Sequence, residues 1–263
     1  MKEDQLSSSA SSLENALQLL KMFTMDEPEL RLSEIAEKLG VAASTAHRLV
    51  NTLVAEGFVV KDPRTNMYRL GASILAFGKM ITAQIKLYRE ALPILQELVN
   101  KSNETAHIGI LDQTDTVYLH KIECSHPVRL LSHSGKRNPA YCTGTGQLIL
   151  AYQDERTVNR VIERGLVRKT PKTITRPDEF LSLLNTIRKQ GFAIASEQLH
   201  EGVTSIAAPI RDLSGQVVAS VAVVGPVQRI TTARIRPLTH LVVQAGHEIS
   251  ERMGCKSIFE TRI

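Results

Sequence analysis

Between residues 32 and 70, the apolar positions follow first a helical and then an extended pattern. From Ser33 to Leu39, apolar side chains recur three and four residues apart, and Ser33 is a favourable N-cap. Gly40 stands where a helix ends in a left-handed residue, and a second helix is expected to open near Ser44. The inner face of that second helix consists of Ala46, Leu49, Val50, Leu53 and Val54. Two helices joined by so short a turn predict a helix-turn-helix.

The segment after the second helix has the pattern of a two-stranded wing. Gly57 ends the helix, Phe58 to Val60 and Met67 to Leu70 have strand-like composition, and Asp62 to Asn66 forms the turn between them. Upstream, a helix from about Ser12 to Phe23 would complete a three-helix body. Its predicted inner face consists of Leu13, Ala16, Leu17, Leu20 and Phe23. This order predicts a winged helix-turn-helix domain over residues 1–71.

The polar face of the second helix carries short hydroxyls, an amide, an imidazole and one guanidinium, which are groups that contact base edges and phosphates. We therefore expect this face to enter the major groove of double-stranded operator DNA. The wing would add contacts to phosphates or the minor groove. The expected DNA-binding residues are Ser33, Ser44, Thr45, His47, Arg48, Asn51, Lys61, Arg64 and Arg69. The alternative is a small helical subdomain whose polar face is merely solvated.

Residues 72–90 are expected to form a linker and dimerisation helix, at the start of a helical stretch that runs from Ala72 to Asn100. Pro93 is expected to kink or restart this helix. The predicted seam consists of Ile74, Phe77, Ile81 and Ile85, followed by inward-facing Leu92, Leu95, Leu98 and Val99. One interpretation is an amphipathic helix that packs on the domain behind it. We favour a linker that pairs two protomers, because helix-turn-helix modules usually bind DNA as dimers.

Residues 91–263 alternate between strand and helix patterns, which predicts an α+β domain with a mostly antiparallel sheet. The expected strands cover residues 106–111, 116–122, 128–132, 205–211 and 217–224. The expected helices cover residues 144–152, 155–164, 177–190 and 232–253.

Composition narrows the function classes. The chain of 263 residues has a net charge of +5, yet its first 86 residues contain ten basic and ten acidic side chains, so the positive charge is weak support for DNA binding. Three widely spaced cysteines, a polar N-terminus and no long apolar run favour a cytoplasmic protein without a membrane segment. The histidines and cysteines fit no strict zinc spacing, and no nucleophile has an ordered base beside it, so neither a metal site nor an enzyme is expected.

Several segments resemble one family. The most specific are His47-Arg48-Leu49, Glu56 to Val59, Tyr68 to Gly71, and Gly202 to Ile210. They accompany two longer stretches, GKRNPAYCTGTGQLILAY and GFAIASEQLHEGVTSIAAPIRDLSGQVVASVAVVGP. Together they resemble the isocitrate lyase regulator (IclR) family of bacterial transcription factors, from about Leu13 to Met253.

The resemblance implies a GAF-like C-terminal domain that binds a small metabolite beside the loop from Tyr141 to Gly146. Two glycines before an apolar helix also suit an anion on physical grounds, although such a pair alone indicates only a turn. The implied effector-binding residues are Tyr141, Thr143, Gly144, Thr145, Glu197, Ser205, Ser220, Ala222 and Val224. Glu197 is expected either to face the pocket or to cap the following loop.

The resemblance also implies a one-component regulator, either a homodimer or a dimer of dimers, that needs no cofactor. A repressor of catabolic genes is the main hypothesis; an activator, or a C-terminal domain that serves assembly alone, are alternatives. Two departures from the family pattern bear on the effector. Ala195 replaces an acidic side chain of some relatives, and Ala222 and Val224 replace small polar ones. The pocket is thus expected to be apolar and to take an organic, sugar or aromatic acid larger than a two-carbon acid.

Overall fold

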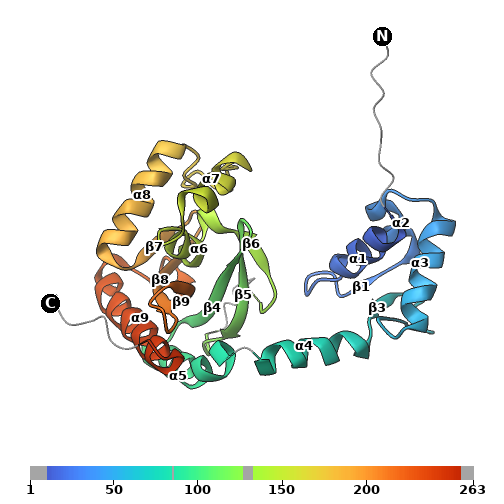
Figure 1. The fold of residues 1–263 in the computed structure, drawn as a ribbon, viewed down its shortest axis with the longest axis horizontal. Coiled ribbons are helices and arrows are strands. Elements are labelled where there is room, and N and C mark those ends of the chain that lie inside the picture. The colour runs from blue at the N-terminus through green and yellow to red at the C-terminus, as the bar shows by residue number, and fades with distance from the viewer. Residues whose placement is uncertain (1–10, 85, 127–132, 256–263) are drawn as a thin grey trace, which may run out of the picture. The chain divides into compact units, whose positions relative to one another are not determined.

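The computed structural model describes residues 11–84, 86–126 and 133–255. The chain divides into two compact units, Met1–Gln84 and Ile85–Ile263 (Figure 1). Each unit has its own apolar core. The predicted strand at residues 128–132 lies outside the described residues.

The first unit is a winged helix-turn-helix, as predicted. Helices α1 (Ser12–Met22), α2 (Leu32–Leu39) and α3 (Ala43–Ala55) pack around a core that includes Leu19, Ile35 and Val50. Strands β1 (Glu29–Leu30), β2 (Val59–Lys61) and β3 (Tyr68–Leu70) form an antiparallel sheet in the order β1-β3-β2. Helix α4 (Ala72–Gln84) follows the wing.

The turn between α2 and α3 has the geometry that the sequence predicts. Gly40 has a φ of +66°, and its N–H donates to the Glu37 carbonyl. The Val41 N–H donates to the Ala36 carbonyl, so the last turn of α2 is closed by two hydrogen bonds. The left-handed conformation, which glycine adopts without steric cost, turns the chain sharply into α3.

Two details of the first unit differ from the predictions. Helix α2 begins at Leu32 and its N-cap is Arg31, whose N–H donates to the Glu34 carboxylate at 2.7 Å; Ser33 is therefore in the first turn and is not the cap. The predicted inner face of α1 was also partly wrong. Leu13 and Leu17 are 70% and 51% exposed, while the core takes Asn15, Leu19 and Phe23.

The second unit is built on a six-stranded, fully antiparallel sheet in the order β6-β5-β4-β9-β8-β7, which confirms the predicted α+β class. Its strands are β4 (Thr105–Asp112), β5 (Asp115–Ile122), β6 (Arg137–Pro139), β7 (Ala193–Ser196), β8 (Val203–Arg211) and β9 (Val217–Pro226). The short strands β6 and β7, at the two ends of this order, were not predicted.

Helices cover both faces of this sheet (Figure 1). One core cluster joins α5 (Lys86–Ser102) and α9 (Thr232–Met253) to β4, β8 and β9. A second cluster, centred on Phe180, Leu148 and Ala222, joins the sheet to α6 (Gly144–Leu150), α7 (Glu155–Glu163) and α8 (Pro177–Gln190). A 3₁₀ turn, η1 (Ala140–Cys142), leads from β6 into α6.

The long helical stretch differs from its prediction at two points. Helix α5 continues through Pro93, where a kink or a restart was expected. Leu92 is exposed, whereas Leu95, Leu98 and Val99 are buried as predicted. Of the predicted seam, Ile74 is half-buried and Phe77 stacks on Phe58, with ring centroids 5.8 Å apart; the side chains of Ile81 and Ile85 are not described.

Candidate functional site

The exposed face of α3 presents a continuous polar surface. Ala46, Val50 and Leu53 anchor the helix in the core, which leaves Ser44, Thr45, His47, Arg48 and Asn51 exposed to solvent. The Asn51 amide lies 3.4 Å from the His47 imidazole one turn away, so these two side chains are held side by side. This surface carries the hydrogen-bond donors and acceptors that base edges and phosphates require.

The wing carries the remaining basic side chains that the sequence predicted to contact DNA. Lys61, Arg64 and Arg69 are exposed on β2, on the hairpin turn and on β3. Asp62 fixes the turn, because its carboxylate accepts from the backbone N–H groups of Arg64 and Thr65. The Lys61 ammonium lies 5.6 Å from the centroid of the Tyr68 ring. Ser33 is exposed on α2.

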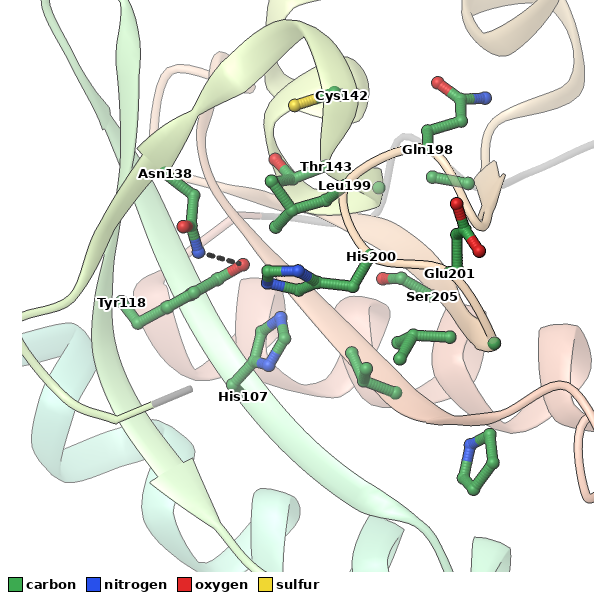
Figure 2. A pocket seen from close by; sticks show the side chains of 16 residues that line it. His107, Tyr118, Asn138, Cys142, Thr143, Gln198, Leu199, His200, Glu201 and Ser205 are labelled. Carbon is green, nitrogen blue, oxygen red and sulfur yellow. Dashed lines mark hydrogen bonds between the residues drawn. The ribbon is translucent and has the colours of Figure 1, made fainter. Parts of the chain in front are cut away.

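A cavity of about 400 Å³ opens in the second unit between the sheet, η1 and the loop that joins β7 to β8 (Figure 2). Apolar side chains such as Leu199, Val203 and Val224 share its lining with a few polar ones. Among the described residues that line it, none is Lys or Arg, and Glu201 carries the one acidic side chain. A concave, largely apolar site with few polar groups is typical of small-molecule binding.

The start of α6 forms one wall of the cavity. Thr143 is the N-cap, and its hydroxyl accepts from the Gly146 N–H at 3.0 Å. Gly144 lies so close to β8 that an added Cβ would be 2.7 Å from the Ser205 hydroxyl, and one at Gly146 would be 2.3 Å from the Ala140 carbonyl oxygen. The two glycines are therefore required by close packing of the turn. Thr145 is buried behind it, with its hydroxyl 3.2 Å from the His107 imidazole.

The opposite wall is formed by His107 on β4 and Tyr118 on β5. Their rings are tilted against each other with centroids 4.3 Å apart, and the Tyr118 hydroxyl accepts a long hydrogen bond from the Asn138 amide at 3.5 Å. Burial, with a smaller contribution from Lys121, lowers the pKa of His107 to about 3, so its imidazole is neutral near pH 7. Burial also raises the pKa of the Tyr118 phenol. This wall is polar but uncharged.

The loop from Glu197 to Gly202 covers the cavity and is tied at both ends. Glu197 has a φ of +56°, pairs with Lys172, and accepts from the Gly202 N–H at 2.9 Å. The Thr173 hydroxyl donates to the Gln198 carbonyl at 2.7 Å. Glu197 thus closes the loop on itself, which is the second of its two expected roles, while Gln198 to Gly202 contribute to the cavity wall.

The cavity brings together some of the expected effector residues. Thr143, Gly144, Ser205 and Val224 line it. Tyr141, Thr145, Glu197, Ser220 and Ala222 are not among its lining residues. Tyr141 donates its hydroxyl to the Val167 carbonyl at 2.6 Å, and Ser220 and Ala222 are fully buried in β9.

Several lining residues were not anticipated: His107, Tyr118, Asn138, Cys142, Gln198 and His200. The sequence suggested His107 only as a possible metal ligand, and Cys142 as a possible metal ligand or nucleophile. The described His, Cys, Asp and Glu side chains include no group of three placed to hold a metal ion. Within the same described ranges, no helix is long and apolar enough to cross a membrane.

Comparison with known proteins assigns both units. Residues 12–63 match the IclR helix-turn-helix domain, and residues 80–251 match the family described as bacterial transcriptional regulator IclR C-terminal. The HTH-type transcriptional regulator XynR of Escherichia coli is 30% identical over 92% of this chain and 97% of its own length. The transcriptional repressor IclR of Escherichia coli is 29% identical over 92% of this chain and 90% of its own.

Solved structures share the architecture. The IclR transcriptional regulator of Alicyclobacillus acidocaldarius superposes with a TM-score of 0.82 at 27% identity, over 92% of this chain and 98% of that one. The two family domains occur in the expected order. They accompany an exposed helix of the helix-turn-helix and a ligand-sized cavity, so the family assignment agrees with the structure. The chain belongs to the IclR family of bacterial transcriptional regulators, with an N-terminal helix-turn-helix and a C-terminal effector domain.

Proposed function

We propose that this chain is a one-component repressor of catabolic genes that acts in the cytoplasm. It binds operator DNA through α3 and the wing, and it releases the operator when a small organic acid enters the cavity. The observation that carries the proposal is the cavity of about 400 Å³ in a chain whose other unit exposes a polar recognition helix. The similarity to a relative named a transcriptional repressor supports repression rather than activation.

The proposed DNA contacts follow the exposure of the first unit. Ser44, Thr45, His47, Arg48 and Asn51 would enter the major groove, and Ser33 would approach the backbone from α2. Arg48 is the main candidate for a base or phosphate contact, since it is the basic residue of α3 and is exposed. Lys61, Arg64 and Arg69 would contact phosphates or the minor groove, where their positive charge favours binding.

The proposed assembly is a homodimer or a dimer of dimers. Helix α4 leaves Leu75 and Phe77 62% and 51% exposed, which is a large apolar surface for a helix next to a DNA-binding domain. A second copy packed there would place two recognition helices on one duplex. Light scattering of the purified chain distinguishes a monomer, a dimer and a tetramer.

The proposed role of the cavity is binding rather than catalysis. Cys142 is the cysteine in its wall, and burial raises the pKa of the Cys142 thiol to about 12, which keeps it protonated and weakly nucleophilic. The effector is proposed to be an organic, sugar or aromatic acid. Its carboxylate would approach the Thr143-Gly144 turn, because the first N–H groups of a helix lack intrahelical acceptors.

The experiment has two stages. The operator is first located by footprinting the purified chain on the DNA upstream of its own gene and of the neighbouring genes. Operator affinity is then measured by fluorescence anisotropy with and without each acid of a panel, alongside thermal unfolding of the protein. An acid that both raises the unfolding temperature and weakens operator binding supports the proposal. A panel in which every acid that stabilises the protein leaves operator affinity unchanged contradicts it.

A further inference from the structure

His107 is a buried polar residue in the cavity wall whose hydrogen bonding is incomplete within the described chain. The side chain is 2% exposed, and one ring nitrogen, Nε2, lies 3.2 Å from the Thr145 hydroxyl. The other, Nδ1, has no hydrogen-bond partner within the described residues. Buried polar atoms are nearly always paired, because an unpaired one carries a desolvation penalty. The His107 side chain points into the cavity, which places a bound molecule within reach of it (Figure 2).

The surroundings of His107 define the kind of group that could pair with it. The imidazole is neutral, so it offers one N–H and one lone pair, and the Thr145 hydroxyl, which can donate or accept, occupies one of them. A polar neighbour of His107 in the wall is Tyr118, whose hydroxyl accepts a hydrogen bond from the Asn138 amide. Because no Lys or Arg is among the described lining residues, a carboxylate at this wall would lose its hydration without gaining a cation. A hydroxyl can donate or accept, so it can pair with Nδ1 in either tautomer of the neutral imidazole.

The shape of this wall adds a second requirement. The His107 and Tyr118 rings form an aromatic corner, and Leu199, Val203 and Val224 contribute apolar surface to the same cavity. A flat, apolar body would pack against these groups, and a hydroxyl on its edge would meet the imidazole nitrogen.

We propose that the effector is a hydroxylated organic acid with a ring or similarly flat apolar body, and that the neutral hydroxyl of this effector hydrogen-bonds to Nδ1 of His107. This inference rests on the proposed function of the cavity as the effector site. His107 then sets specificity, because an analogue without the hydroxyl leaves the buried nitrogen unpaired. Thr145 is a positioning residue, since its hydroxyl lies 3.2 Å from Nε2 and holds the imidazole ring in place.

The test uses matched pairs of acids that differ by one hydroxyl: benzoate with its three monohydroxy isomers, phenylacetate with its hydroxy isomers, and cyclohexanecarboxylate with its hydroxy derivatives. Affinities for the full-length protein are measured by calorimetry. We expect the best hydroxylated acid to bind at least about tenfold more tightly than its parent, since a site built to pair a hydroxyl rejects the analogue that lacks it. In His107→Phe, the hydroxylated acid should lose that advantage while the parent acid keeps its affinity.

Two further variants keep the test decisive. Thr145→Val leaves the imidazole in place but removes its hydroxyl partner, so it should reduce the preference for the hydroxylated acid even if His107→Phe does not fold. His240→Phe makes the same substitution at an exposed site on α9 and should leave the preference unchanged.

The outcomes separate the two proposals. Equal affinity within every pair that binds, or a preference that survives in both His107→Phe and Thr145→Val, overturns the role of His107 and leaves effector binding intact. Failure of every acid to bind overturns the proposed function of the cavity, and the inference about His107 falls with it.

Discussion

Acid destabilisation of the second unit should depend on His107. Its pKa is about 3 in the folded chain, against 6.5 for a free imidazole, because burial disfavours the charged form. Above pH 6.5 both the folded and the unfolded chain hold a neutral imidazole, so His107 adds no pH dependence there. As the pH falls from 6.5 towards 3, only the unfolded chain takes up this proton, and stability is lost. Between pH 7.5 and pH 5 the loss from His107 alone amounts to about 2 kcal/mol.

The measurement is urea unfolding of the wild-type chain and of His107→Gln at both pH values, at one protein concentration. Tyrosine fluorescence reports chiefly on the second unit, which contains Tyr88, Tyr118, Tyr141 and Tyr152, and the chain has no tryptophan. Carboxylates and the other histidines titrate in both proteins, so their contribution cancels in the difference.

When the pH is lowered from 7.5 to 5, the free energy of unfolding of His107→Gln should fall by about 2 kcal/mol less than that of the wild-type chain. This difference is the whole contribution of His107. His240→Gln, at an exposed site on α9, is the control and should behave as the wild-type chain does. Equal losses in the wild-type chain and in His107→Gln would show that the buried imidazole gains its proton without unfolding, contrary to this prediction.

Three further substitutions test other parts of the structure. Arg48→Ala should weaken operator binding at least about tenfold, the cost of one lost groove contact, while effector binding measured by thermal shift persists; full operator affinity would exclude Arg48 from the recognition surface. Gly144→Ala would bring a Cβ within 2.7 Å of the Ser205 hydroxyl, so calorimetry should show weaker effector binding than in the wild-type chain. An unchanged affinity would show that this turn is not part of the effector site. Glu104→Gln removes the charge of a fully buried carboxylate that lies 2.6 Å from Arg229 and 3.3 Å from Arg234. Urea unfolding should show a free energy of unfolding lower by about 3 kcal/mol. An unchanged midpoint would show that these ion pairs do not stabilise the fold.

The winged helix-turn-helix was predictable because its signals are local. Gly40 adopts the left-handed conformation that the turn needs, and the apolar spacing of α3 matches the face that it buries. Helix α1 was harder, since apolar residues occur on more than one side of it. Leu13 and Leu17 match helical spacing as well as Leu19 and Phe23 do, and only packing against α2 and α3 selects the second pair.

The cavity was predictable only where the family resemblance indicated its residues, which are Thr143, Gly144, Ser205 and Val224. Thr143 and Gly144 are adjacent in the sequence, and the family resemblance identified their turn. His107 and Tyr118 meet through the pairing of β4 with β5, whose register shifts between Ile108 and Gly109. A register irregularity of this kind leaves no clear trace in the sequence, so the polar wall of the cavity emerged only from the folded chain.

The proposed function requires that the cavity and the recognition helix be energetically coupled. The most direct test is an anisotropy titration of a labelled operator duplex with the full-length protein, in the absence and in the presence of a saturating acid whose binding calorimetry has verified. Coupling of ordinary strength predicts operator binding weakened by about five- to 150-fold, and an equal weakening of acid binding when operator is saturating. An operator affinity that stays the same at saturating acid would show that the two sites are not coupled.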